Sequence, residues 1–242
     1  RVARLRQRLR APHPAELLRG DDLPTLDMLR RAGFSERMIE RFFVPLFGGI
    51  QLDPSLATSR RMFDVIFRTL ADGDSVVPAL GMQAIPDQLA AKLPAGAVEF
   101  GVRAESVTAD RVDTDRGSIA AGAVVVACEG PAAARLLGLP AVGSQPVGAV
   151  WFAADAAPSD TRMVVLNGDH RDRDTGRVLN AAIMTNIAPS YAPSGHHLIV
   201  AALPGHVDGD LESAARRTFR AWWGGQVDGW THLATHRIAH GQ

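Results

Sequence analysis

Three histidines near the end of the chain recur at four-residue spacing, and imidazole is a common metal ligand in proteins. On a helix, His232, His236 and His240 would lie on one face and could hold a metal ion. The neighbouring Thr231 and Thr235 favour a strand instead. On a strand the three rings would share a face but spread over about 27 Å at 3.3 Å per residue. We therefore expect surface or core-edge histidines and no metal site.

An acidic loop carries Asp169, Asp172 and Asp174 with Gly176, which resembles a calcium-binding loop. The spacing differs from that of an EF-hand, and no downstream glutamate supplies a bidentate ligand. Residues 178–187 are rich in residues that favour strands. We expect this loop to be a hairpin connection without a calcium ion.

Cys128 is the single cysteine of the chain, so an intrachain disulfide is excluded. A lone thiol fits a reducing compartment, and we expect a cytoplasmic protein. Because Cys128 ends the apolar run from Ala123, we expect it to act as a small buried hydrophobe rather than as a nucleophile.

Trp151 and Phe152 are neighbours on a predicted strand, so their side chains must point to opposite faces of a sheet. One of the two should therefore face the open sheet surface. Tyr191 lies in the proline-containing loop 188–193 and could border the same region. Trp151 and Tyr191 are our candidates for binding an apolar substrate, and we expect the remaining tryptophans to belong to the core.

Bulk composition narrows the possible partners. The chain has 242 residues, with 26 Lys+Arg against 26 Asp+Glu. A balanced charge argues against nucleic acid or an anionic membrane as a partner. No apolar run approaches the roughly 18 residues that a membrane span needs, so we expect no transmembrane segment.

The order of predicted elements indicates an α/β fold (α+β overall) built as two interleaved domains. The first third reads as helices, with Thr25 and Ser35 as N-caps and a further helix from about Ser59 to Ala71. A short helix and short strands follow from Pro78. Beyond Pro140 the pattern is that of an antiparallel sheet with one helix. The predicted strands are 98–100, 106–108, 112–114, 123–128, 147–153, 163–166, 178–187, 198–203 and 232–238.

Three motifs carry a resemblance to a known family. They are GGI-x-LDP at 48–54, VPALGMQAIPDQLA at 77–90 and VVVACEGPAAARLLG at 124–138. Their order and spacing resemble the FAD-dependent amine oxidase and phytoene desaturase-like oxidoreductases.

The resemblance implies a division of the chain between an FAD-binding domain and a substrate domain. Residues 1–77 would form the helical part of the substrate domain, and 78–139 the middle segment of an incomplete FAD/NAD(P)-binding domain. Residues 140–235 would form the sheet part of the substrate domain, and 236–242 would begin the return to the FAD domain.

The resemblance also implies FAD as cofactor and residues that contact it. The main chain of Val102 lies where relatives hold the adenine ring, and Glu129 and Gly130 lie where the chain passes the nucleotide. Glu129 is expected to cap the following helix. The reaction would be hydride transfer from a small-molecule amine or apolar substrate to the flavin, which needs no acid–base pair from this chain, so we name no catalytic residue.

The glycine fingerprint expected at the start of such enzymes does not occur in these residues. We therefore expect an internal fragment that is inactive by itself. The alternative is a non-catalytic binding or scaffold protein that derives from the same fold without the cofactor. The oligomeric state is left open.

Overall fold

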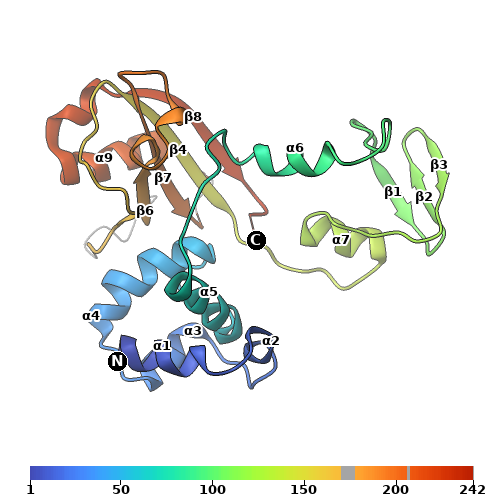
Figure 1. The fold of residues 1–242 in the computed structure, drawn as a ribbon, viewed down its shortest axis with the longest axis horizontal. Coiled ribbons are helices and arrows are strands. Elements are labelled where there is room, and N and C mark those ends of the chain that lie inside the picture. The colour runs from blue at the N-terminus through green and yellow to red at the C-terminus, as the bar shows by residue number, and fades with distance from the viewer. Residues whose placement is uncertain (170–177, 206–207, 242) are drawn as a thin grey trace.

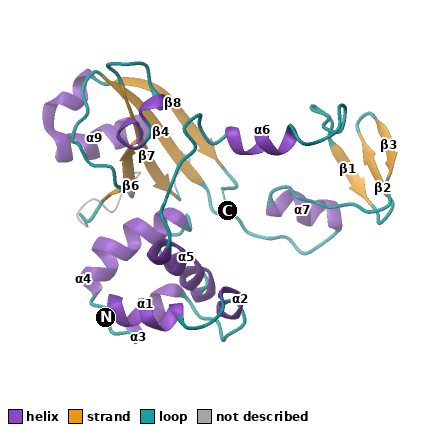
Figure 2. Cartoon of the chain, viewed as in Figure 1, coloured by secondary structure: helices purple, strands orange, loops and turns teal. Residues whose placement is uncertain are grey.

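The protein is described here by a computed structural model that covers residues 1–169, 178–205 and 208–241 (Figure 1). Helices and two antiparallel sheets alternate along the chain (Figure 2). This mixture confirms the predicted α/β (α+β) class. Three parts follow one another: a helical part over 1–72, a middle part over 78–139 and a sheet part over 140–241.

Six helical segments build the helical part, and their apolar faces share one core. Phe43, Phe47 and Phe63 are almost fully buried in it, and the ring centroids of Phe47 and Phe63 lie 4.4 Å apart. Aromatic packing of this kind supplies much of the stability of a small core. The segments are α1 (Val2–Arg10), α2 (Pro14–Leu17), α3 (Thr25–Arg31), α4 (Glu36–Met38), the π-helix η1 (Ile39–Gly48) and α5 (Arg60–Asp72).

One of the two predicted helix caps is confirmed, since Ser35 Oγ accepts a hydrogen bond from Met38 N. Ser59, near which the fourth helix is predicted to begin, is also an N-cap, and its Oγ accepts a hydrogen bond from Arg61 N. The prediction for Thr25 is wrong, because Pro24 is the N-cap and Thr25 is the first helical residue. The Thr25 hydroxyl instead donates to Thr58 O at 2.7 Å, which ties α3 to the loop before α5.

The middle part is a small unit with little core of its own. Throughout this range, which the structure describes completely, Ala134 alone is buried. Figure 1 shows this part extending away from the other two. Its elements are α6 (Ala84–Ala90), β1 (Ala104–Val107), β2 (Arg111–Thr114), β3 (Gly117–Ala120) and α7 (Gly130–Leu137).

Two predicted strands of the middle part are wrong. Residues 98–100 and 123–128 have no regular secondary structure, and the side chain of Val125 is 87% exposed. A buried strand needs neighbours that accept its main-chain hydrogen bonds, and the described residues place none beside either segment. Cys128 is accordingly exposed, which corrects the expectation of a buried thiol.

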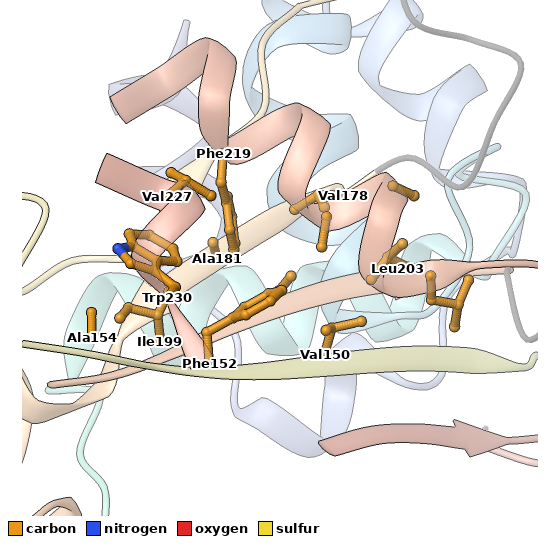
Figure 3. Close-up of a cluster of buried hydrophobic side chains, with 14 of the residues drawn as sticks. Val150, Phe152, Ala154, Val178, Ala181, Ile199, Leu203, Phe219, Val227 and Trp230 are labelled. Carbon is orange, nitrogen blue, oxygen red and sulfur yellow. The ribbon is translucent and has the colours of Figure 1, made fainter. Parts of the chain in front are cut away.

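The sheet part contains five strands in the order β5-β6-β7-β4-β8, all paired antiparallel. Helix α9 covers one face, and Figure 3 shows Phe152, Phe219 and Trp230 meeting in the core between them. The elements are β4 (Val147–Ala154), β5 (Val165–Leu166), β6 (Asn180–Ile183), α8 (Met184–Ile187), η2 (Pro189–Tyr191), β7 (His197–Pro204), α9 (Leu211–Trp223), η3 (Gly224–Gly229) and β8 (Thr231–Ile238).

The predicted strand 178–187 is too long, because β6 ends at Ile183 and a turn of helix, α8, follows. The hydroxyl of Thr185 in α8 accepts a hydrogen bond from Leu198 N, so the helical turn is tied to β7. Tertiary contacts of this kind override the strand preference of the residues themselves.

The helical and sheet parts meet at the end of η1. Asn180 Nδ2 donates to Pro45 O at 2.9 Å. A Cβ atom on Gly49 would lie 2.0 Å from the same Asn180 nitrogen, so glycine is needed for this close approach. The contact fixes the outer face of β6 against the helical part.

Candidate functional site

The sheet part has one covered face and one open face. On β4, Phe152 is fully buried under α9, whereas Trp151 is half-buried on the other side. The prediction that these neighbours point to opposite faces is confirmed. The same alternation continues in β7, where Ile199 and Ala201 are fully buried and Val200 is not.

Directly paired residues of an antiparallel sheet point to the same face, so the strand register identifies the residues of the open face. One row across the strands runs through Asn180, Ala202, Ala149 and His236. The adjacent row runs through Ala182, Val200, Trp151 and Ala234. Small and apolar side chains dominate both rows, and Trp151 and His236 are the large side chains near the edge strand β8.

A hydrogen bond joins these two rows. Trp151 Nε1 donates to His236 Nδ1 at 3.1 Å. The ring centroids lie 6.5 Å apart at an interplanar angle of 73°. An indole nitrogen can only donate, so Nδ1 of His236 must be the unprotonated ring nitrogen.

Two of the three spaced histidines, His232 and His236, lie on strand β8, as their neighbours predict, whereas His240 lies in the turn after it. The two histidines on the strand do not share a face. The register of β8 against β4 shifts between Trp151 and Phe152. His232 therefore lies on the α9 side, where its Nδ1 is 3.3 Å from Glu212 Oε2, while His236 lies on the open face. The β-bulge is the physical reason why the prediction of a shared face is wrong.

The other predicted substrate-binding residue, Tyr191, lies in η2. Its hydroxyl donates to Pro78 O at 2.8 Å, and the neighbouring Ser190 hydroxyl bonds to Ala79 O. Tyr191 thus fastens the chain segment that leads into the middle part onto the sheet part. Its predicted contact with substrate stays a prediction.

The predicted cofactor contacts all lie in the middle part. Val102 is half-buried two residues before β1, and within this described segment neither its N–H nor its C=O is paired. Glu129 and Gly130 are exposed at the start of α7, which packs beside β1. Glu129 is the N-cap residue, but its side chain makes no capping hydrogen bond, which corrects the expected capping role.

These main-chain groups have the chemistry that a dinucleotide needs. The free N–H groups in the first turn of α7 are donors suited to phosphate or ribose oxygens, and the helix dipole favours them. A Cβ on Gly130 would lie 3.2 Å from Val142 Cγ2, so a larger residue would press on the following loop. The hydrogen-bonding groups of these residues are therefore of the kinds that an adenine dinucleotide requires.

Sequence reasoning missed the role of residues inside the GGI-x-LDP motif. Gln51 is 1% exposed, and neither polar atom of its side chain has a hydrogen-bond partner. Leu52 has a positive φ of 53°, which is strained for a side chain of this type. Asp53 is buried and accepts hydrogen bonds from the main chain and hydroxyls of Ser55 and Thr58. The motif thus forms a loop that is held by buried hydrogen bonds. The residue types alone do not predict this loop, because it depends on the backbone conformation at Leu52.

The acidic loop lies largely beyond what the structure describes. The flanking strands β5 and β6 pair antiparallel, as the hairpin prediction requires. Asp172, Asp174 and Gly176 belong to residues 170–177, outside the described residues. Among the residues that the structure does describe, no three His, Cys, Asp or Glu side chains gather closely enough to hold a metal ion.

The helical cluster, the small α/β unit and the antiparallel sheet with one open face together define an α/β fold of the FAD-dependent oxidoreductase type. The chain belongs to the family of flavin containing amine oxidoreductases, whose family model matches residues 1–239.

Solved structures support the fold. The chain is similar to an oxidoreductase from Methanosarcina mazei, with a TM-score of 0.66 and 16% identity over 92% of this chain and 58% of that one. It is also similar to reduced UDP-galactopyranose mutase, with a TM-score of 0.63 and 13% identity over 97% of this chain and 61% of that one. A protein from Pyrococcus furiosus has a TM-score of 0.64 and 12% identity over 98% of this chain and 61% of its own.

This chain therefore spans about three fifths of the length of these solved structures. A comparison with curated proteins found no match. In the described part of the chain, even the longest helices, α5 and α9 with 13 residues each, are too short to cross a bilayer.

Proposed function

We propose that this chain is the substrate-side portion of an FAD-dependent oxidoreductase that oxidises a small amine or apolar molecule. The observation that carries the proposal is the open, apolar face of the five-stranded sheet, with Trp151 and His236 on it. The family match over residues 1–239 supports flavin as the redox group.

The cofactor contacts belong to the middle part. Val102 would pair with the adenine edge through its main-chain N–H and C=O, and the start of α7 at Glu129 and Gly130 would face the nucleotide oxygens. The Glu129 carboxylate repels phosphate, so its main chain and not its side chain would make the contact. When bound, the flavin supplies the hydride acceptor for the reaction.

The domain division belongs to the same proposal. Residues 1–77 and 140–235 would form the substrate domain, and 78–139 would form part of the FAD-binding domain. The exposed apolar side chains of the middle part support this, since Leu80, Phe100 and Val125 are each more than 80% exposed. Large apolar side chains with this degree of exposure support a further layer of protein over the middle part.

Residues of the open face would bind and orient the substrate and exclude water. Ala149, Ala202 and Val200 offer an apolar floor without charge, on which an apolar molecule loses its hydration shell. Trp151 adds a large flat surface beside this floor.

Purification of the intact gene product that contains this chain tests the function. We expect a yellow protein whose flavin absorbance bleaches anaerobically on addition of substrate. A colourless intact product without flavin would contradict the proposal and favour the non-catalytic binding or scaffold protein. A flavin that binds only when the Val102 and Gly130 region is intact would support the assigned contacts.

A further inference from the structure

The single hydrogen bond between Trp151 and His236 determines what His236 can offer to a molecule on the open face. Nδ1 accepts the indole N–H at 3.1 Å. In a neutral imidazole the other ring nitrogen then carries the proton. His236 is an exposed residue, so its Nε2–H is a hydrogen-bond donor that a bound molecule can reach.

The surroundings of His236 offer a ligand little other polar recognition. Its neighbours along the row, Ala149 and Ala202, have no polar side-chain atoms, and Asn180 at the far end donates to Pro45 O. The next side chain along the strand, Arg237, points to the other face and donates to Gly209 O. No acidic side chain belongs to these two rows of the open face, so neither row offers a carboxylate to an ammonium group.

We propose that His236 is a specificity-determining residue that selects an apolar small molecule bearing a hydrogen-bond acceptor, such as a carboxylate or carbonyl oxygen, over one bearing an ammonium group. Trp151 is a positioning residue that holds His236 in the Nε2–H tautomer. This inference rests on the proposed function and narrows its substrate class.

The Nε2–H group of His236 is a donor with no carboxylate in the two rows beside it, and this explains why a ligand with an acceptor is preferred to one with an ammonium group. A carboxylate or amide oxygen accepts from Nε2–H, whereas an ammonium group is itself a donor and leaves both N–H groups unpaired. An unpaired donor at a partly desolvated position costs binding free energy.

Three probes with the same ring test the selection on the full chain: phenylacetate, phenylacetamide and phenethylammonium. Their binding can be followed by NMR through the ring resonances of the probes, which serve the variants as well, and in the parent chain also through the ring resonances of His236. We expect phenylacetate and phenylacetamide to shift the His236 resonances and to bind about tenfold more tightly than phenethylammonium, the value of one hydrogen bond. Equal affinity for the ammonium probe would overturn the proposal.

Two variants and one matched control separate recognition from structure. His236→Phe keeps a ring without a donor and should lower the affinity for phenylacetate about tenfold, while leaving that for phenethylammonium unchanged. His240→Phe replaces another exposed histidine and should change neither affinity. An unchanged phenylacetate affinity in His236→Phe would overturn the assignment.

The tautomer of the His236 ring can be measured directly, and it would not change if Trp151 had only a structural role. Nitrogen chemical shifts of His236 should report the Nε2–H form in the parent chain and a mixture of tautomers in Trp151→Phe, with a loss of phenylacetate affinity of a few fold. A parent chain with the Nδ1–H form would overturn the proposal. These measurements need no flavin, so a flavin-free intact gene product would remove the proposed function and leave the binding preference standing.

Discussion

At the scale of single residues, two buried aspartates of the helical part have opposite electrostatic environments. Burial acts to raise the pKa of Asp53, but hydrogen bonds from Ser55 and Thr58 outweigh it and hold the pKa below its usual value. Burial raises the pKa of Asp64, and the charges of Arg8 and Arg60 oppose it only in part. Asp64 Oδ1 also has no hydrogen-bond partner.

Asp53→Asn should destabilise the chain at neutral pH by roughly 1–3 kcal/mol, because an amide cannot accept all the donors around it. A pKa lowered in the folded state adds stability above the unfolded pKa, and this stability is lost as the pH falls through the folded pKa. The difference between parent and variant should therefore shrink below about pH 4. Urea unfolding at several pH values measures it, and a difference that grows in acid would contradict the assignment.

Asp64→Asn should have the opposite effect. A pKa raised in the folded state adds stability below the unfolded pKa, and this stability is lost as the pH rises through the folded pKa. Removing the charge should therefore raise the free energy of unfolding at neutral pH by about 1 kcal/mol or less, with no gain below about pH 4. The same urea series tests this, and a loss at pH 7 as large as that of Asp53→Asn would be incompatible with it.

At the scale of elements, the contact between η1 and β6 is the feature that fixes the open face relative to the helical part. Gly49→Ala would bring a methyl group to 2.0 Å from Asn180 Nδ2, so the Asn180 side chain must leave its bond to Pro45 O. We expect a loss of roughly 1–3 kcal/mol in thermal or urea unfolding.

A double-mutant cycle identifies the cause of that loss. In an Asn180→Ala background, Gly49→Ala should cost less, with a coupling of at least about 0.5 kcal/mol. Gly225→Ala in η3 is the matched control, because no atom lies within 4 Å of its added methyl group. The control should be neutral or slightly stabilising. Additive losses at Gly49 and Asn180 would show that they do not act through this contact.

Much of the element pattern could be predicted from sequence because local signals decide it. The cap at Ser35, the alternation at Trp151 and Phe152, and the strand around His236 all follow from propensity and side-chain period. The bulge in β8 and the strained Leu52 could not be predicted, since both depend on backbone geometry that side-chain type does not encode. The Trp151–His236 bond followed neither from spacing nor from the resemblance, because 85 residues separate the partners.

At the scale of the whole molecule, the middle part differs from the other two parts because very few of its side chains are buried. The class of fold was predictable, since helices, a small α/β unit and a sheet follow in an order that the three motifs also support. The strands at 98–100 and 123–128 were not, because a strand exists only beside a partner and sequence alone does not show whether the partner is present.

Hydrogen exchange on the full chain should show the same division. Amides of β4, β7 and α9 should be the most protected, because they surround the largest buried cluster. Amides of 78–139 should exchange at least about tenfold faster, since few side chains there are buried. Mass spectrometry of peptic fragments measures both, and equal protection of the two regions would show that the middle part has a stable core of its own.

The β-bulge in β8, opposite Trp151 and Phe152 of β4, places two histidines of one strand in different environments. His232 lies on the α9 side of the sheet beside Glu212, and His236 lies on the open face beside Trp151. Replacing one histidine should therefore leave the contacts of the other intact. Replacement of His232 should change the melting temperature, whereas replacement of His236 should change which ligand is preferred. Deletion of Leu233, the residue of β8 without a partner in β4, would make the pairing regular and leave each ring on its own face, because His232 would still lie opposite Phe152 and His236 opposite Ala149.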